Sequence, residues 1–166
     1  MAWVYISLGS NIDREVLTRA GVMSLRRHFG EVILSSVYKS EAVGFDGEDF
    51  YNMVIALQTD IDVHQVSKIL HQIEDEFGRD RSGPRFSSRT LDLDLLLYDD
   101  LVLDEEKLQV PRDEILERAF VLWPLAEIAP DLMHPQIQKT YAELWQSFDK
   151  NKEKLEPIEF DFDLKG

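Results

Sequence analysis

The sequence has no cysteine, few basic residues and no long apolar run. The absence of cysteine excludes disulfide bonds, thiolate metal sites and cysteine nucleophiles. Among 166 residues, 18 are Lys or Arg and 32 are Asp or Glu, and the formal charge of −14 argues against nucleic acid or an anionic membrane as the main partner. No stretch approaches the roughly 18 consecutive apolar residues of a membrane span, and the N-terminal stretch lacks the basic region of a signal peptide. We therefore expect a cytoplasmic protein that binds neither nucleic acid nor membranes.

Two common active-site motifs are also missing. The glycine-rich P-loop pattern that ends in Gly-Lys-Ser/Thr does not occur, so phosphates are not bound by a P-loop. The nucleophile elbow of serine hydrolases does not occur either, and the four histidines show no metal-ligand spacing. Gly9-Ser10-Asn11 does not match a dinucleotide-binding fingerprint, and we interpret it as a tight turn. Any site for an anionic substrate must therefore use local positive side chains or recruit metal cations.

Hydrophobic periodicity predicts an alternation of strands and helices before residue 100. Two amphipathic helices are expected, from Asp13 to about Gly30 and over residues 63–77, and Asp60 or Asp62 can cap the second. Short alternating or β-branched segments predict strands at 3–8, 31–40, 51–59 and 91–98. The order βαββαβ is that of a ferredoxin-like α+β fold, an antiparallel sheet with helices packed on it.

The later part of the chain predicts shorter elements, mainly additional C-terminal helices. We expect a strand at 107–110 and helices at 113–120, 124–129 and 140–148, with Pro124 opening the second of these helices. EFDFDL, residues 159–164, alternates and is interpreted as an edge strand or a tail. An apolar share of 44% and a charged share of 30%, without repeats or an evident linker, fit one domain over residues 1–166. The tail from about 150 to 166 has no assigned role, and we expect a monomer.

The stretch RTLDLDLLLYDD, residues 89–100, places carboxylates within an otherwise apolar strand. Side chains alternate faces along a strand, so Asp92 and Asp94 point to the same side, about 7 Å apart. The preceding loop, residues 79–89, carries four arginines against one aspartate. Because arginine binds phosphate oxygens and paired aspartates can hold Mg²⁺, a metal-bound phosphate ligand would accommodate both charge signs. The common alternative for such a charged run is a solvated surface loop.

Aromatic residues beside an amide give a second indication of a ligand. Phe50 and Asn52 open one predicted strand, and Phe120 follows Arg118 closely. Aromatic faces stack on flat rings and an amide offers both donors and an acceptor, so this set could bind a heterocycle. Packing in the core is the alternative for each phenylalanine taken singly.

Five stretches together resemble one enzyme family, the 6-hydroxymethyl-7,8-dihydropterin pyrophosphokinases of folate biosynthesis. They follow in order along most of the chain: YISLGSN (5–11), FYNMVIAL (50–57), IEDEFGR (73–79), RTLDLDLLLY (89–98) and VPRDEILERAFVLWPLAEIAPD (110–131). The combination of RTLDLD with the last stretch is far more specific than paired aspartates alone. The resemblance implies transfer of the β,γ-pyrophosphoryl group of ATP to the hydroxymethyl oxygen of the pterin, with release of AMP.

The resemblance also implies roles for individual residues. The implied catalytic residues are Arg81, Arg89, Asp92 and Asp94, of which the two aspartates would bind two Mg²⁺ ions. The implied contacts to ATP are Glu74, Arg79, Lys107 and Arg118. The implied pterin-binding residues are Ser40, Val43, Phe50, Asn52 and Phe120. Such a set agrees with the chemistry, because positioning and charge neutralisation do most of the work in phosphoryl-type transfer.

The chain departs from the family pattern at Glu41, His71, Ser87, Ser88 and Arg112. The last of these stands after Val-Pro, where the family favours histidine. We interpret the departures as tuning of loop dynamics and ATP affinity, because both aspartates and the main arginines are present. An impaired paralogue that binds pterin or nucleotide without turnover is the alternative. A ferredoxin-like regulatory module is a weaker one, since it would not need the combination of arginines and aspartates.

Overall fold

The computed structural model describes residues 1–41, 49–78 and 91–162. Within these ranges, six strands form one sheet in the order β5-β1-β4-β3-β8, and β2 also pairs with β4. Every neighbouring pair in this sheet is antiparallel. The strands are β1 (Ala2–Ser10), β2 (Val32–Leu34), β3 (Val37–Ser40), β4 (Phe50–Thr59), β5 (Asp92–Tyr98) and β8 (Leu155–Ile158). A separate hairpin pairs β6 (Leu103–Glu105) with β7 (Leu108–Val110).

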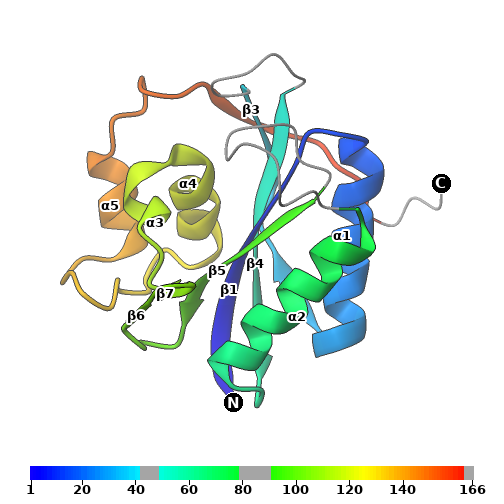
Figure 1. The fold of residues 1–166 in the computed structure, drawn as a ribbon. Coiled ribbons are helices and arrows are strands. Elements are labelled where there is room, and N and C mark those ends of the chain that lie inside the picture. The colour runs from blue at the N-terminus through cyan, green and yellow to red at the C-terminus, as the bar shows by residue number, and fades with distance from the viewer. Residues whose placement is uncertain (42–48, 79–90, 163–166) are drawn as a thin grey trace.

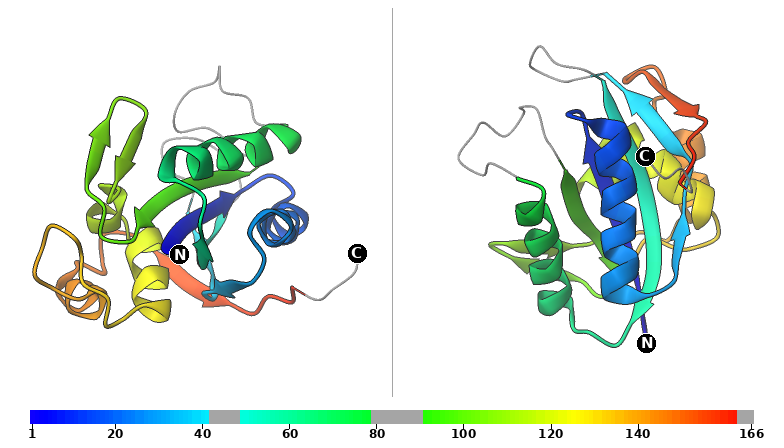
Figure 2. Two further views of the ribbon diagram at one scale, coloured as in Figure 1. Left: turned by 90° about the horizontal axis from the view of Figure 1, so that it is seen from below. Right: turned by 90° about the vertical axis from the view of Figure 1, so that its right-hand side faces the viewer.

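The sheet lies between two groups of helices (Figure 1). Helices α1 (Arg14–Phe29) and α2 (Val63–Glu76) cover one face. Helices α3 (Glu114–Glu117), α4 (Ala119–Ile128) and α5 (Tyr141–Ser147) lie on the other side, as the views of Figure 2 also show. The result is a mixed α and β architecture with an antiparallel sheet, as the sequence predicts.

Alternation along the strands gives each face of the sheet its own apolar core. Ile6, Leu8 and Ile55 point toward α1 and α2, and each is at most 1% exposed within one continuous cluster. Val54 points the other way and packs in a second cluster with Val121 of α4. Each fully buried aliphatic side chain contributes about 1.5–3 kcal/mol, so both faces hold the helices firmly. In the described part of the chain, no helix combines the length and apolar character that crossing a membrane requires.

The predicted limits of α2 agree with the structure because they depend on local capping signals. Oδ1 of Asp62 accepts hydrogen bonds from the backbone N–H of His64 at 2.9 Å and of Gln65 at 3.1 Å. Of the two aspartates that the sequence offers as caps, this is the one used. Gly78 follows the helix with a φ of 77°, a left-handed conformation that favours glycine.

The strand predicted over residues 31–40 is interrupted and forms two strands, β2 and β3. Oγ of Ser35 accepts a hydrogen bond of 2.9 Å from the backbone N–H of Val54. The backbone N–H of Ser36 donates instead to the carboxylate of Glu127 in α4, at 3.0 and 3.1 Å. Side-chain oxygens thus accept the N–H groups of Val54 and Ser36 in place of backbone carbonyls, and the strand is divided here.

The prediction of a tight turn at Gly9 and Ser10 is wrong. Both residues continue β1 and pair with Asn52 and Tyr51 of β4. The chain stays extended here because β4 runs beside β1 along its whole length. Turn formation therefore does not explain the glycine at position 9.

One prediction in the later part of the chain also needs correction. Pro124 lies inside α4 rather than at its start. The apolar residues before it are buried, with Val121 and Leu122 at 1% exposure, and their burial outweighs the preference of proline for the first turn. The C-terminal strand is β8 at Leu155–Ile158, and residues 159–162 of the EFDFDL stretch follow it as a tail, which is one of the two interpretations that the sequence allows.

Candidate active site

The two aspartates at the start of β5, here called the acidic pair, point to the face that α3, α4 and α5 cover. Asp92 pairs with Gly9 and Asp94 with Ser7 across β1. Leu93, between them, belongs instead to the core beneath α1 and α2. The side chain of Asp94 is 24% exposed, which places the pair at the margin of the core and in contact with solvent. The prediction that both carboxylates share one face is confirmed.

Glu74 of α2 contacts the backbone of the strand that carries the acidic pair. The residue is 3% exposed, and its Oε2 accepts a hydrogen bond of 2.9 Å from the backbone N–H of Leu93. Because β5 stands at one end of the strand order, this bond satisfies an N–H on the outer side of the sheet. In this structure Glu74, which the resemblance assigns to ATP, holds the segment between Asp92 and Asp94 in place.

Arg112 precedes α3 and lies beside the acidic pair. Its backbone N–H donates to the carbonyl of Leu96 at 3.0 Å, which attaches the residue to β5. Its Nε donates to Oε1 of Glu114 at 2.9 Å, and its Nη2 lies 3.5 Å from Oδ1 of Asp94. Burial makes the largest contribution and lowers the pKa of Arg112, but the carboxylates of Asp94, Glu114 and Asp92 together outweigh it and raise the pKa. A guanidinium thus bridges Glu114 and Asp94, and Asp94 is one of the two predicted metal ligands.

Arg118, the residue at the N-cap of α4, contacts the C-terminal segment. Its Nη1 lies 3.6 Å from Oε2 of Glu153. The other oxygen of that carboxylate accepts a hydrogen bond of 2.8 Å from the backbone N–H of Ala119. One carboxylate therefore neutralises the arginine and caps the helix at the same time. Glu153 lies in the tail to which the sequence assigns no role, and its place at this site was not predicted.

The described pterin-binding candidates on β3 and β4 lie together. Nδ2 of Asn52 donates to Oγ of Ser40 at 2.6 Å, and both residues are buried. Phe50 is the cross-strand partner of Ser40. A Cβ added to Gly9 would lie 3.2 Å from Oδ1 of Asn52 and 3.8 Å from Cδ1 of Phe50. Glycine is therefore present at this position because the side chains of β4 approach the backbone of β1 closely.

Gly9 connects the acidic pair to the amide of Asn52. It pairs with Asp92 on one side and with Asn52 on the other, so the three residues form one row across β5, β1 and β4. Neighbouring strands are about 4.8 Å apart, which separates the backbones of Asp92 and Asn52 by roughly 10 Å. The middle residue of the row has no side chain. The acidic pair and the pterin-binding candidate Asn52 thus lie on one face of the sheet, and the strand residue between Asp92 and Asn52 is a glycine.

Phe120 is the second residue of α4 and is partly buried against the second apolar cluster. The helix packs on β3 and β4, the strands that carry Ser40, Phe50 and Asn52. The fold therefore brings Phe120 to the layer above the pterin-binding candidates. Its stacking on a pterin ring stays a prediction.

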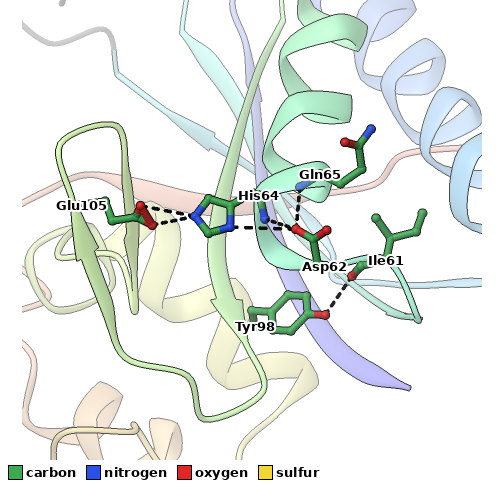
Figure 3. Close-up of polar contacts among 6 residues, drawn as sticks. All are labelled: Ile61, Asp62, His64, Gln65, Tyr98 and Glu105. Atoms are coloured by element: carbon green, nitrogen blue, oxygen red, sulfur yellow. Dashed lines mark hydrogen bonds and ion pairs between the residues drawn. The ribbon is translucent and has the colours of Figure 1, made fainter.

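Lys107 is exposed in the turn between β6 and β7. The hairpin is attached to α2 by His64, whose Nε2 lies 2.6 Å from Oε1 of Glu105 (Figure 3). The hydrogen bond and the negative charge of Glu105 raise the pKa of His64. Figure 3 also shows Tyr98 at the end of β5, whose hydroxyl donates to the carbonyl of Ile61 at 2.8 Å. These two contacts fix the start of α2 relative to β5 and to the hairpin that presents Lys107.

A cavity of about 600 Å³ lies between the end of β3, the start of β4 and the C-terminal segment. Charged side chains of both signs line it, among them Lys39, Glu41, Asp49, Glu153 and Lys154. The first three flank the pterin-binding candidates in sequence. The C-terminal segment therefore borders the region where the pterin is expected.

Several predicted residues lie outside the described part of the chain. These are Val43, Arg79, Arg81 and Arg89, together with the departures Ser87 and Ser88. The arginine loop and one residue of the pterin loop therefore stay predictions, whereas the acidic pair, Glu74, Arg118 and the β3 and β4 residues have defined places.

The acidic pair fits a metal ion that arrives together with phosphates. Among the residues that the structure describes, no three or more His, Asp or Glu side chains are arranged to hold a metal ion. Mg²⁺ is usually bound by one or two carboxylates, with waters and substrate phosphates completing its coordination. The partly exposed side chains of Asp92 and Asp94 supply this number of ligands.

Comparison with known proteins points to one family. A family model described as 7,8-dihydro-6-hydroxymethylpterin-pyrophosphokinase matches residues 5–130. The 2-amino-4-hydroxy-6-hydroxymethyldihydropteridine pyrophosphokinase of Bacillus subtilis is 41% identical over 128 residues, which are 75% of this chain and 76% of that protein. The protein of the same name from Haemophilus influenzae is 35% identical and is matched over 95% of this chain and 100% of its own length.

Solved structures agree in fold. A crystal structure of an HPPK-DHPS protein in complex with substrates has a TM-score of 0.70 and 12% identity, over 88% of this chain and 43% of that one. Wild-type HPPK-DHPS of Plasmodium falciparum with pteroate has a TM-score of 0.69 and 14% identity, over 87% and 42% of the two chains. The chain thus spans less than half the length of these solved proteins, and at this identity the likeness concerns the fold.

Proposed function

The chain belongs to the 7,8-dihydro-6-hydroxymethylpterin-pyrophosphokinase family, and from this premise we propose that it transfers the β,γ-pyrophosphoryl group of ATP to 6-hydroxymethyl-7,8-dihydropterin. The products are the pterin diphosphate and AMP, and the reaction serves folate biosynthesis. The observation that best supports the proposal is the row of Asp92, Gly9 and Asn52 across three strands. In this proposal the phosphates lie near Asp92 and the heterocycle near Asn52, on the same face of the sheet, with Gly9 between them.

The triphosphate of ATP is proposed to lie along the start of β5. Asp92 and Asp94 would hold two Mg²⁺ ions there. When bound, the metal supplies charge neutralisation and orients the attacking and leaving oxygens. Glu74 contributes by holding the strand between the two aspartates. The side chains proposed to supply further positive charge to ATP are Arg79, Arg81, Arg89, Lys107 and Arg118.

The pterin is proposed to lie over the β3 and β4 end of the row. Because Nδ2 of Asn52 donates to Ser40, Oδ1 is directed toward Gly9 and can accept a hydrogen bond from the heterocycle. Phe50 and Phe120 would stack on the two faces of the ring system. Ser40 and Val43 would contribute backbone contacts at the margin of the pterin.

In the reaction, the hydroxymethyl oxygen attacks the β-phosphorus of ATP, and the proton of the hydroxyl group is released. The bond from that phosphorus to the α,β-bridging oxygen breaks, and AMP leaves with this oxygen. Phosphoryl-type transfer needs little covalent help from the protein, so alignment of the two substrates accounts for much of the acceleration. The shared face of β5, β1 and β4 is suited to that alignment because its residues belong to rigid strands.

We also propose a ferredoxin-like core in which the second strand of the βαββαβ order is divided into β2 and β3. Residues 1–166 are proposed to form one domain that works as a cytoplasmic monomer. The extra helices and β8 then belong to the same unit, because Glu153 contacts the start of α4 and β8 extends the sheet at β3.

The experiment that tests the function is a nucleotide assay with 6-hydroxymethyl-7,8-dihydropterin, ATP and Mg²⁺. AMP, and not ADP, should appear in a one-to-one ratio with the pterin diphosphate when products are separated by chromatography. Asp94→Ala should abolish turnover, whereas Asp131→Ala, at an exposed aspartate after α4, should leave it unchanged.

Formation of ADP, or full activity of Asp94→Ala, would rule out the proposed reaction. Binding of both substrates without any AMP would instead identify an impaired paralogue.

A further inference from the structure

Arg112 places a positive charge beside the acidic pair. Its Nη2 lies 3.5 Å from Oδ1 of Asp94, while its Nε donates to Glu114 at 2.9 Å. The side chains of Arg112, Asp94 and Glu114 are 34%, 24% and 25% exposed. Charges that are this far withdrawn from water interact more strongly than charges on an open surface.

The position of Arg112 is set by the fold as well as by charge. Its backbone N–H donates to the carbonyl of Leu96, so the residue is attached to the strand that carries the acidic pair. Glu114 stands two residues further on, at the start of α3, and holds the guanidinium from the other side. The arginine is therefore a built part of this site rather than a mobile surface side chain.

Binding of a metal ion to Asp94 is opposed by the positive charge of Arg112. A divalent ion binds a carboxylate oxygen at about 2.1 Å, so an ion on Oδ1 would stand within about 6 Å of the guanidinium. Two positive charges at this separation repel each other. Metal binding by the free protein must therefore displace Arg112 or overcome its charge.

We propose that Arg112 is a resident counter-cation of the acidic pair, which opposes metal binding until ATP is present and then transfers to the phosphates. Arginine binds phosphate oxygens through two parallel hydrogen bonds, so the triphosphate offers Arg112 a partner that replaces Asp94. Removal of the Arg112 charge from Asp94 then favours the metal. Metal and nucleotide thus raise each other's affinity, as reciprocal coupling requires. The inference rests on the proposed function, because that function brings ATP to the acidic pair.

The test is metal binding by the free protein, measured with Mn²⁺ through the loss of its free-ion signal in electron paramagnetic resonance. Arg112→Gln and Arg112→Met remove the charge and should bind Mn²⁺ about tenfold more tightly than the original protein. Arg112→Lys keeps the charge and should stay within about twofold of it. Glu114→Gln leaves the arginine and removes a carboxylate, so it should not tighten Mn²⁺ binding.

The same titrations are repeated with α,β-methylene-ATP, in which the bond to be broken cannot react. The nucleotide should raise the Mn²⁺ affinity of the original protein several-fold more than that of the two neutral variants. Circular dichroism checks that the two neutral variants are folded. Because there are two of them, the test can still be decided if one fails to fold. Unchanged or weaker Mn²⁺ binding by the neutral variants would overturn the proposal, and so would a lysine variant that behaves like them.

The result is independent of turnover, so failure of this inference and failure of the proposed function can be told apart. Tighter Mn²⁺ binding in a protein that forms no AMP would support the counter-cation and reject the reaction. AMP formation together with unchanged Mn²⁺ affinity would do the reverse.

Discussion

Replacement of Gly9 by alanine should weaken pterin binding and leave the protein folded. The new Cβ would lie 3.2 Å from Oδ1 of Asn52, so the amide would have to move by a few tenths of an ångström. Asn52 has little freedom to do so, because it is 7% exposed and its Nδ2 is bonded to Ser40 at 2.6 Å. The added methyl group therefore acts directly on the amide that is proposed to bind the heterocycle.

Two effects of opposite sign act on the free energy of unfolding of Gly9→Ala. Alanine is favoured over glycine within a strand by roughly 0.5–1 kcal/mol, because glycine loses more backbone freedom on folding. Crowding of a packed neighbour costs about 1–3 kcal/mol, and one tight contact corresponds to the lower end of that range. The net change should be smaller than about 1 kcal/mol. Pterin binding has no such offset, and loss of one hydrogen bond worth about 1.4 kcal/mol raises the dissociation constant about tenfold.

A second glycine gives a matched control on the opposite face of the sheet. A Cβ on Gly21 of α1 would lie 2.8 Å from Cδ1 of Leu8 and 3.1 Å from Cδ1 of Leu91, both almost completely buried. Gly21→Ala should therefore lower the free energy of unfolding by about 1 kcal/mol, after a partial offset from the better helix propensity of alanine. Its pterin affinity should be unchanged.

Calorimetric titration with 6-hydroxymethylpterin, in the presence of α,β-methylene-ATP, measures the affinity of both variants. Thermal unfolding followed by circular dichroism measures their stability. Normal pterin affinity in Gly9→Ala would refute the assigned role of the row. A loss of affinity that accompanies an equal loss of stability in both variants would refute it as well.

Two further outcomes are expected. Glu153→Gln should tighten binding of α,β-methylene-ATP by up to about fivefold in calorimetry. The reason is that a partly exposed ion pair worth about 0.2–1 kcal/mol no longer has to break before Arg118 binds a phosphate. Unchanged affinity would contradict this. His64 has a pKa raised by Glu105, so its stabilising contact is complete below the ordinary value of 6.5 and is lost as pH rises through the raised value. The difference in thermal stability from His64→Gln should therefore shrink as the pH rises above 6.5, and a difference that grows would exclude this role.

Features that depend on neighbouring residues could be predicted from the sequence. Asp62 and Gly78 delimit α2 through a side-chain cap and a left-handed backbone, and both signals are local. Strand alternation alone was enough to place Asp92 and Asp94 on one face, because the period of two allows no other arrangement in a regular strand. The amphipathic face of α2 followed from spacing in the same way.

Contacts between distant residues could not be predicted from such patterns. Glu153 reaches Arg118 across the fold, and no local signal in the tail marks it as the cap of α4. The sequence marks Arg112 only as a departure from a motif. Its nearness to Asp94 cannot be predicted locally, because it depends on how the chain returns to β5 after the β6–β7 hairpin. Pro124 shows the related case in which burial of a whole apolar helix overrides a local preference.

The place of β5 at the end of the sheet has a consequence for solubility. An outer strand offers unpaired backbone groups to which another chain can add itself, and this is a common route to aggregation. Here Glu74 accepts the N–H of Leu93, and the N–H of Arg112 donates to the carbonyl of Leu96. The charges of the acidic pair further disfavour a second strand at this edge. The groups that form the proposed phosphate site therefore also protect the sheet from self-association, so mutational tolerance at these positions is limited by two independent requirements.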